Sequence, residues 1–208
     1  MTPPAVPAPS ARPPARDAIT GLILAGGRGA RMGDLDKGLL PWRGKPLVAH
    51  VCDRLAPQVG SLLISANRNL DRYAAYGAVL PDEAALGPWQ GPLAGVAAGL
   101  AAATTAWLAV APCDTPRLPS DLVPRLADAV AAGAAPLAVA SAGGRRHSVC
   151  MLLAVSLLPD LLDYLRGGLR KVDTWQARVG AVEVPFGDDG GFFNINTPDQ
   201  LADKESPP

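Results

Sequence analysis

The sequence predicts an α/β fold in three layers, with a mostly parallel central sheet and helices on both of its faces. Short apolar runs of strand length alternate along the chain with longer segments that have the length and pattern of helices. The run at 106–110 is almost wholly apolar, as expected of a parallel strand that is covered on both faces. With 208 residues, 49% of them apolar, the chain is long enough for one domain with its own core.

Composition excludes several classes of protein. The formal net charge is zero, so we expect neither nucleic acid nor an anionic membrane as a partner. No segment has the roughly 18 uninterrupted apolar residues that a membrane span needs. Residues 1–17 are rich in Pro and Ala and lack an apolar core, which predicts a disordered extension rather than a signal peptide. The three cysteines are widely separated and form no metal or disulfide pattern, which favours a cytoplasmic location.

Residues 18–208 are predicted to form a single domain, whose first part alternates strands and helices regularly. Glycine and proline punctuate this part at the expected boundaries of the elements. Strands are predicted at 21–25, 61–65, 78–80 and 106–110, and helices at 46–57, 70–76 and from about 92 to 103.

Each of these four strands is followed by glycine or polar residues. In a parallel sheet the carboxyl ends of the strands meet at one edge, and ligands bind outside that edge. We therefore predict a binding site formed by the residues that follow the strands. They are Gly26 and Gly27, Ser65 and Asn67, Asp82, and Asp114.

The second part of the domain is less regular. A helix over 120–133 is predicted to be capped by Ser120, and two strands at 136–140 and 149–155 flank a basic turn at 143–148. Two helices at 157–165 and 169–175 and a strand at 182–185 are predicted to follow. Thr197, with Pro198 and Gln200 after it, has the pattern of a capping box at the start of a last helix.

The stretch 20–51 has the composition of a phosphate site. Its strand runs directly into Gly26-Gly27-Arg28-Gly29, and three glycines in four positions let backbone N–H groups come close to a ligand. The cations Arg31 and Lys37 follow. The segment lacks the Gly-Lys-Ser/Thr of a Walker loop, and its G-x-G-x-x-x-G spacing differs from the dinucleotide fingerprint. An ordinary strand-to-helix turn with solvated basic residues is the alternative.

A longer pattern contains this turn. Residues 24–47 read L-A-G-G-x-x-x-R-M-G-x-x-D-K-G-L-L-x-x-x-G-K-P-L, which resembles the opening signature of the nucleotidyltransferases and, within them, of the molybdenum cofactor guanylyltransferases. G-P-L-A-G at 91–95, P-C-D-T-P at 112–116 and N-I-N-T-P at 194–198 extend the resemblance. It implies a Rossmann-like nucleotidyltransferase fold, with a nucleotide-binding half at about 18–116 and a cofactor-substrate half at about 117–208.

The reaction implied by the resemblance is transfer of GMP from GTP to the terminal phosphate of molybdenum-bound molybdopterin, with Mg²⁺ as cofactor. Catalysis would then rest on positioning and charge stabilisation, without a side-chain nucleophile. GTP and molybdenum-molybdopterin are the implied substrates, and transient contacts with cofactor-biosynthesis proteins and apo-molybdoenzymes are expected. Three alternatives stay open: a molybdenum cofactor cytidylyltransferase, a sugar-phosphate nucleotidyltransferase, and a non-catalytic nucleotide or cofactor carrier.

Three residues are the predicted catalytic set. Asp114 follows a buried strand and lies between two prolines, and a carboxylate there suits Mg²⁺. The alternative is a carboxylate that caps the turn before Pro116. Lys37 and Arg31 suit the triphosphate and would stabilise the charge that moves onto pyrophosphate. We expect Cys113 to be a small buried residue rather than a nucleophile.

Asp82 is the candidate reader of the base. One carboxylate can accept hydrogen bonds from both N1–H and the N2 amino group of guanine, whereas cytosine has no such pair of donors. A turn carboxylate beside Pro81 is the alternative. The family often carries Asn where this chain has Ser65, so Asn67 is a candidate substitute. By resemblance, the remaining GTP-binding residues are Leu24, Ala25, Gly26 and Gly27.

A second substrate site is predicted in the other half of the chain. Molybdopterin carries a terminal phosphate and a polar pterin, and both suit cations and amides. Each candidate taken singly is also compatible with a structural role. The candidates are Arg145, His147, Arg170, Lys171, Asn194 and Asn196.

Overall fold

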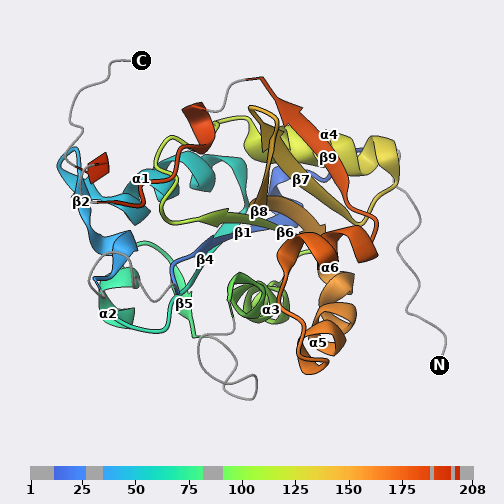
Figure 1. The fold of residues 1–208 in the computed structure, drawn as a ribbon, viewed down its shortest axis with the longest axis horizontal. Helices are drawn as coiled ribbons and strands as arrows, with labels where there is room; N and C mark the ends of the chain where they lie inside the picture. The colour runs from blue at the N-terminus through green and yellow to red at the C-terminus, as the bar shows by residue number, and fades with distance from the viewer. Residues whose placement is uncertain (1–11, 27–34, 82–90, 188–189, 198–199, 202–208) are drawn as a thin grey trace.

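The computed structural model describes residues 12–26, 35–81, 91–187, 190–197 and 200–201 (Figure 1). Three predicted site residues, Gly27, Arg31 and Asp82, lie outside the described residues. Of the extension expected to be disordered at residues 1–17, residues 1–11 lie outside the described residues. Arg16 and Asp17, at its end, form with Ala18 a short 3-10 helix, η1 (Arg16–Ala18).

A seven-stranded sheet forms the middle layer of the described structure. Its order is β5-β4-β1-β6-β8-β7-β9. β8 runs antiparallel to both of its neighbours, and the other pairs are parallel, so the predicted mostly parallel sheet is confirmed. The strands are β1 (Ile19–Leu24), β4 (Ser61–Ser65), β5 (Ala78–Leu80), β6 (Trp107–Pro112), β7 (Leu137–Ala142), β8 (Arg145–Ala154) and β9 (Val182–Phe186).

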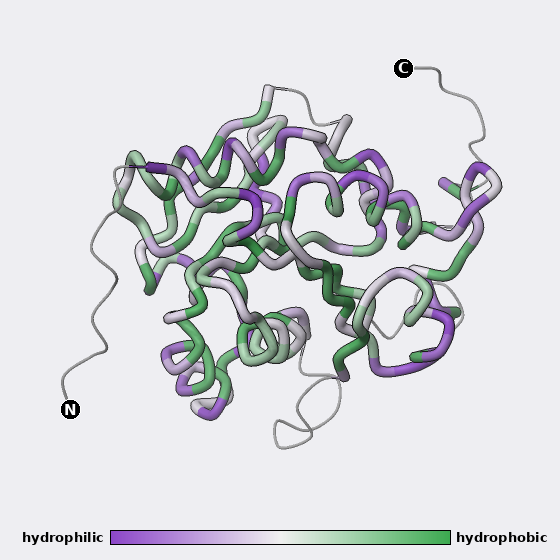
Figure 2. The backbone as a smooth tube through the Cα atoms, turned by 180° about the vertical axis from the view of Figure 1, so that it is seen from behind, coloured by the Kyte–Doolittle hydropathy of each residue, from purple (hydrophilic) through white to green (hydrophobic). Residues whose placement is uncertain are grey.

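Helices cover both faces of this sheet (Figure 1). Neighbouring residues of β1 face opposite layers: Ile23 belongs to a core with Val48 of α1 and Leu126 of α4, while Leu22 packs with Val96 of α3. Figure 2 shows the apolar strands at the centre of the molecule. The helices are α1 (Leu47–Leu55), α2 (Leu70–Tyr73), α3 (Pro92–Ala102), α4 (Leu122–Gly133), α5 (Leu158–Arg166) and α6 (Val172–Arg178).

The three-layer prediction is therefore confirmed. The layers follow from the strand sequences, because alternate side chains of a strand point to opposite faces and the central strands are apolar at both. Among the described residues, no helix has the length and apolar character that crossing a membrane would need.

A small hairpin was not predicted. β2 (Pro41–Trp42) and β3 (Lys45–Pro46) pair antiparallel around Arg43 and Gly44, both of which have positive φ, 48° and 85°. Two-residue hairpin loops favour this conformation because it matches the twist of the strands. The hairpin presents Trp42 to Leu47 and Ile195, and these three form a separate buried cluster. This cluster anchors the segment near the C-terminus beside the start of α1.

The structure corrects three local predictions in the second part of the chain. The expected basic turn at 143–148 is only Gly143-Gly144, because Ala142 pairs with Arg145 and β8 already begins there. Asp121, not Ser120, is the residue before α4, and its side chain makes no capping hydrogen bond. The helix expected at 169–175 begins only at Val172.

Gly99 provides a test of the packing between α3 and the sheet. A Cβ at this position would lie 2.6 Å from Leu22 Cδ2 and 3.2 Å from Leu108 Cδ2, and both leucines are fully buried. Gly99→Val should therefore lower the free energy of unfolding by about 1–3 kcal/mol, measured by urea denaturation. Ala101→Val, at an exposed position of the same helix, is the matched control. Equal losses in both variants would contradict close packing at Gly99.

Candidate functional site

The predicted binding edge is formed where β1, β4 and β6 end. Leu24 pairs with Ser65 of β4 and with Pro112 of β6. Beyond the strands the pairing continues, since Ala25 N–H donates to the carbonyl of Ser65 at 2.8 Å and Cys113 N–H donates to the carbonyl of Leu24 at 3.0 Å. The structure thus brings the segments 24–26, 65–67 and 112–114 side by side, as expected from the parallel order of the strands.

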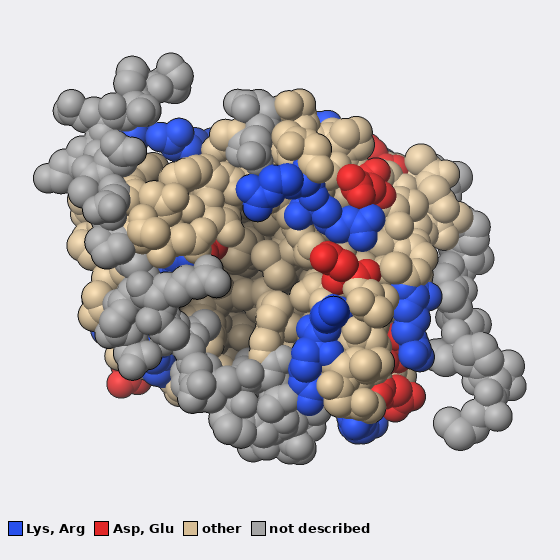
Figure 3. Space-filling model, viewed as in Figure 1, with Lys and Arg blue, Asp and Glu red and all other residues tan. Residues whose placement is uncertain are grey.

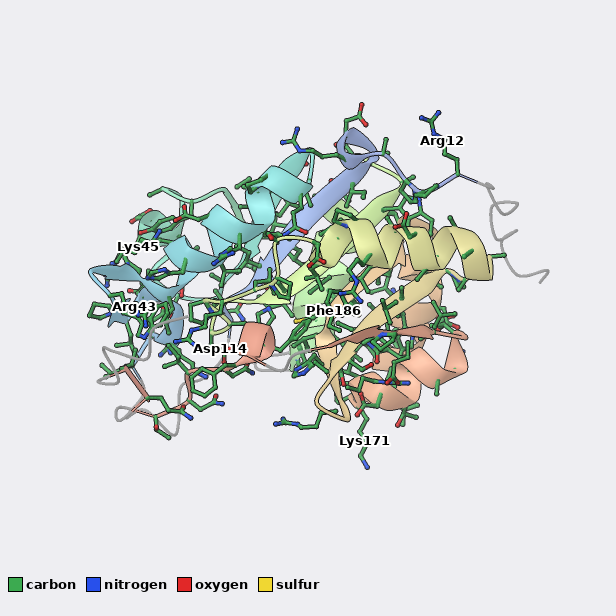
Figure 4. The ribbon with its side chains drawn as sticks, turned by 90° about the horizontal axis from the view of Figure 1, so that it is seen from above. Arg12, Arg43, Lys45, Asp114, Lys171 and Phe186 are labelled. Atoms are coloured by element: carbon green, nitrogen blue, oxygen red, sulfur yellow. The ribbon has the colours of Figure 1, made fainter. Side chains whose placement is uncertain are left out.

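An ion pair lies at this edge. Lys37 Nζ is 2.5 Å from Asp114 Oδ2, although the two residues are 77 positions apart. Lys37 comes from the short 3-10 helix η3 (Lys37–Leu39), and Asp114 comes from the loop after β6, where Figure 4 labels it. The side chains are only 19% and 16% exposed. Two of the three predicted catalytic residues are therefore in direct contact.

Asp114 has a second carboxylate oxygen with a different environment. Oδ1 is buried and has no hydrogen-bond partner among the described residues. A buried carboxylate oxygen is costly to leave unsatisfied, so this atom suits a ligand or a cation. In the described part of the chain no group of three or more His, Cys, Asp or Glu residues could hold a metal. A cation at this position would therefore share Asp114 with ligand oxygens, as Mg²⁺ does with phosphates.

The segment near the C-terminus closes over the ion pair. Asn196 Oδ1 accepts a hydrogen bond from Lys37 Nζ at 2.5 Å. Ile195 N–H donates to the carbonyl of Asp114 at 2.9 Å, and Thr115 Oγ1 donates to Asn194 Oδ1 at 2.7 Å. Asn194 and Asn196, predicted to bind the second substrate, thus contact the loop and the lysine of the first half. Their i, i+2 spacing is the signal that could have indicated two side chains on one side of an extended segment.

The predicted capping box holds this segment in place. Gln200 Oε1 accepts from the N–H groups of Asn196 and Thr197 at 2.6 and 3.2 Å, and Gln200 N–H donates to Thr197 Oγ1 at 3.4 Å. These reciprocal bonds are those of the capping box. They confirm the sequence pattern and fix the backbone next to Asn196.

Ser65 and Asn67 differ in accessibility. Ser65 is 2% exposed, and a Cβ at Gly95 of α3 would lie 2.5 Å from its hydroxyl, so α3 covers it closely. Asn67 is exposed, and its Nδ2 would lie 3.1 Å from a Cβ at Gly26. The amide of Asn67 therefore lies against Gly26 at the edge of the sheet, whereas the hydroxyl of Ser65 lies under α3.

The candidate residues on β8 have distinct surroundings. The ring of His147 stacks on Phe192 with a centroid distance of 4.4 Å and an interplanar angle of 16°. Phe192 in turn meets Phe186 edge to face. Arg145 is exposed, and its neighbour Arg146 forms a two-point contact with Glu183 at 3.1 and 2.9 Å. His147 is thus part of an aromatic cluster, and Arg145 is accessible.

Arg170 and Lys171 lie between α5 and α6. Arg170 NH1 donates to the carbonyls of Leu165 and Leu169 at 2.6 and 2.7 Å, which satisfies the end of α5. Lys171 precedes α6, is exposed and points away from the body of the molecule (Figure 4).

Figure 3 shows a hollow in the face seen in Figure 1, with Lys and Arg side chains along part of its rim.

Cys113 does not have the environment of a nucleophile. Burial, followed by the neighbouring Asp114 carboxylate, raises the pKa of its thiol well above the usual range. A thiol that stays protonated is a poor nucleophile, so the residue acts as a small buried side chain.

Comparison with known proteins gives consistent results. The model of the MobA-like NTP transferase domain matches residues 21–179. The molybdenum cofactor guanylyltransferase of Cupriavidus pinatubonensis is 51% identical over 197 residues, covering 92% of this chain and 98% of the relative. Among solved structures, molybdopterin-guanine dinucleotide biosynthesis protein A from Archaeoglobus fulgidus has a TM-score of 0.73 at 22% identity, covering 89% of this chain and 96% of that one. A Mycobacterium tuberculosis protein in complex with manganese has a TM-score of 0.63 at 18% identity, covering 88% and 96%.

Proposed function

Because the chain belongs to the family of MobA-like NTP transferase domains, we propose that it is a molybdenum cofactor guanylyltransferase that transfers GMP from GTP to molybdenum-molybdopterin. The observation that carries this proposal is the contact of Lys37 with Asp114 at the carboxyl edge of the sheet. This contact supports the proposal, because a cation suited to phosphate lies beside a carboxylate suited to a metal, and nucleotidyl transfer needs both charges.

The nucleotide site is assigned to the edge formed by the first half of the chain, residues 18–116. The backbone of 24–27 would receive GTP, and Lys37 with Arg31 would bind its triphosphate. Asp114 would hold a divalent cation, proposed to be Mg²⁺, and its partnerless Oδ1 supports this assignment. When bound, the cation supplies positive charge next to the phosphate oxygens.

The proposed reaction is a displacement at phosphorus. An oxygen of the terminal phosphate of molybdopterin forms a bond to the α-phosphorus of GTP. The bond from that phosphorus to the oxygen bridging to the β-phosphate breaks, and pyrophosphate leaves with the electron pair. Lys37 stabilises the charge that gathers on the leaving group, and no side chain needs to form a covalent intermediate.

The second substrate is assigned to the half at about 117–208. Arg145 and Lys171 are exposed cations that suit the phosphate of molybdopterin. His147, Arg170, Asn194 and Asn196 remain candidates, although contacts within the protein already engage each of them. Cytoplasmic GTP, cofactor-biosynthesis proteins and apo-molybdoenzymes fit this role as partners.

Turnover with purified components tests the proposal. Pyrophosphate release should be measured with molybdenum-molybdopterin and each of GTP, CTP, ATP and UTP, and GTP should be preferred. Preference for CTP would identify a cytidylyltransferase, and turnover only with a sugar phosphate would identify a sugar-nucleotide enzyme. Tight GTP binding without pyrophosphate release would identify a carrier.

The proposed guanine reader provides a sharper test of base choice. Asp82→Asn replaces one acceptor with a donor and leaves a guanine N–H unpaired, so affinity for GTP should fall roughly ten- to hundredfold. ITP lacks the N2 amino group, so the variant should discriminate GTP from ITP less than the parent does. Calorimetric titration of both proteins with both nucleotides measures this. An unchanged GTP/ITP ratio would reject Asp82 and favour Asn67, whose amide lies beside Gly26, with Asn67→Ala as the matched variant.

A further inference from the structure

Asp36, which directly precedes Lys37, is held by three side chains. Tyr73 donates its hydroxyl to Asp36 Oδ1 at 2.5 Å, and Asn69 Nδ2 donates to Asp36 Oδ2 at 2.8 Å. Arg68 Nε lies 3.6 Å from Oδ2, and the carboxylate side chain is only 8% exposed. A nearly buried carboxylate with a short charge-assisted hydrogen bond has one well-defined position. The hydrogen bond from Tyr73 to Asp36 therefore holds the backbone that leads into Lys37 in place.

Gly38, which directly follows Lys37, packs against the same tyrosine. A Cβ on Gly38 would lie 2.4 Å from the Tyr73 hydroxyl and 3.2 Å from Cys113 Sγ. Tyr73 is fully buried, so it cannot move outward to relieve such a contact. The tyrosine thus touches both neighbours of Lys37 in the chain.

Cys113 connects this packing to the other member of the ion pair, because it directly precedes Asp114. The Tyr73 hydroxyl and Cys113 Sγ both lie beside Gly38, so the tyrosine, η3 and the end of β6 meet at this glycine. Burial is the main cause that raises the pKa of the Tyr73 hydroxyl well above its usual range, and the electrostatic effect of Cys113 and the hydrogen bond to Asp36 add to it. The hydroxyl therefore remains a donor to Asp36 at every working pH.

We infer that Tyr73, acting through Asp36, is a positioning residue that sets the place of Lys37 relative to Asp114 and thereby the affinity for the triphosphate. The inference rests on the proposed function, because it requires that Lys37 binds the β- and γ-phosphates of GTP. Neither Tyr73 nor Asp36 contacts substrate in this account. Their effect on nucleotide binding must pass through Lys37, and that requirement distinguishes a positioning role from general stability.

A double-mutant cycle with GTP and GMP tests the inference. Tyr73→Phe keeps the buried ring and removes the hydrogen bond to Asp36, so GTP affinity should fall about tenfold while GMP affinity changes little. In a Lys37→Ala background the same substitution should leave GTP affinity nearly unchanged, because the side chain that Tyr73 positions is already absent. Isothermal titration of the parent, both single variants and the double variant gives four affinities for GTP and four for GMP.

Tyr76→Phe is the matched control. Tyr76 lies three residues further along, and its hydroxyl has no hydrogen bond among the described residues, so this variant should bind both nucleotides like the parent.

Asp36→Asn is a second test variant, which removes the charged acceptor of the hydrogen bond between Tyr73 and Asp36. It should reproduce the GTP-selective loss, and it carries the test if Tyr73→Phe does not fold.

The outcomes separate the two proposals. Three results would overturn the positioning role while GTP binding by the parent stands. Tyr73→Phe could have the same effect with Lys37 present and in the Lys37→Ala background, or it could weaken GTP and GMP equally. The third result is that neither Tyr73→Phe nor Asp36→Asn weakens GTP binding. A parent protein that does not bind GTP would overturn the proposed function itself, and the positioning role with it. A GTP-selective loss that disappears in the Lys37→Ala background supports the inference.

Discussion

Asp114→Asn is expected to lower the rate of GMP transfer by about 10²- to 10³-fold, the range seen when a single charge-stabilising group is removed from an active site. The substitution keeps the shape of the side chain and an oxygen that can accept from Lys37, whose Nζ lies 2.5 Å from Oδ2. It removes the negative charge that a divalent cation requires. The loss should therefore appear in turnover at saturating GTP and saturating Mg²⁺.

The fold of this variant should persist. The Lys37–Asp114 pair is partly exposed, and Asp114 also makes a backbone contact, in which Ile195 N–H donates to its carbonyl. Asp53→Asn is the matched control, because Asp53 is also paired with a lysine, Lys45, but on the open surface. The control should retain full turnover and the same melting temperature. Near-normal turnover of Asp114→Asn at saturating Mg²⁺ would remove Asp114 from the mechanism.

Lys37→Ala is expected to weaken GTP binding strongly and GMP binding little. The ammonium is assigned to the β- and γ-phosphates, which GMP lacks, and a charge-assisted bond to phosphate contributes about 1.5–3 kcal/mol, or roughly ten- to hundredfold in affinity. Since Lys37 Nζ also contacts Asp114 and Asn196, the variant should in addition lower the melting temperature modestly. Titration with GTP, GDP and GMP measures the selectivity.

The matched control for this prediction is Lys45→Ala. Lys45 lies in the same opening motif, but it is 41% exposed and pairs with Asp53 at the surface. It should bind all three nucleotides like the parent. An equal loss of GTP and GMP affinity in Lys37→Ala would instead place this lysine on the α-phosphate or the ribose.

Local sequence patterns were sufficient for the layers of the fold and for the edge at which the site lies. The apolar runs at 61–65 and 78–80 are strands with the predicted bounds, and the run at 106–110 is the central strand β6 shifted by one or two residues. Period-two and helical patterns are encoded in neighbouring residues, so they can be read without knowing the rest of the chain. The position of Ser65 and Pro112 on either side of Leu24 followed from the parallel order alone.

Where the predictions failed, local patterns were ambiguous. Arg145 and His147 were expected in a turn, but the two glycines before them suffice to close the hairpin, and cross-strand pairing then extends β8 back to Arg145. The hairpin at 41–46 contains two prolines and so lacks a strand pattern. Its positive-φ turn at Arg43 and Gly44 is stabilised by packing of Trp42 against residues near the C-terminus.

The sequence by itself determined the α/β architecture, the capping box at Thr197 and the family to which the motif at 24–47 points. Only the tertiary structure decided which side chains meet. Lys37 contacts Asn196 across 159 positions of the chain, and Asp36 contacts Tyr73 across 37. Such contacts depend on how separate elements pack and on which partner reaches a given polar atom, and neither is encoded in the periodicity of a single segment. For that reason Asn196 was assigned to a substrate from its sequence, whereas the folded chain places it on the lysine of the nucleotide half.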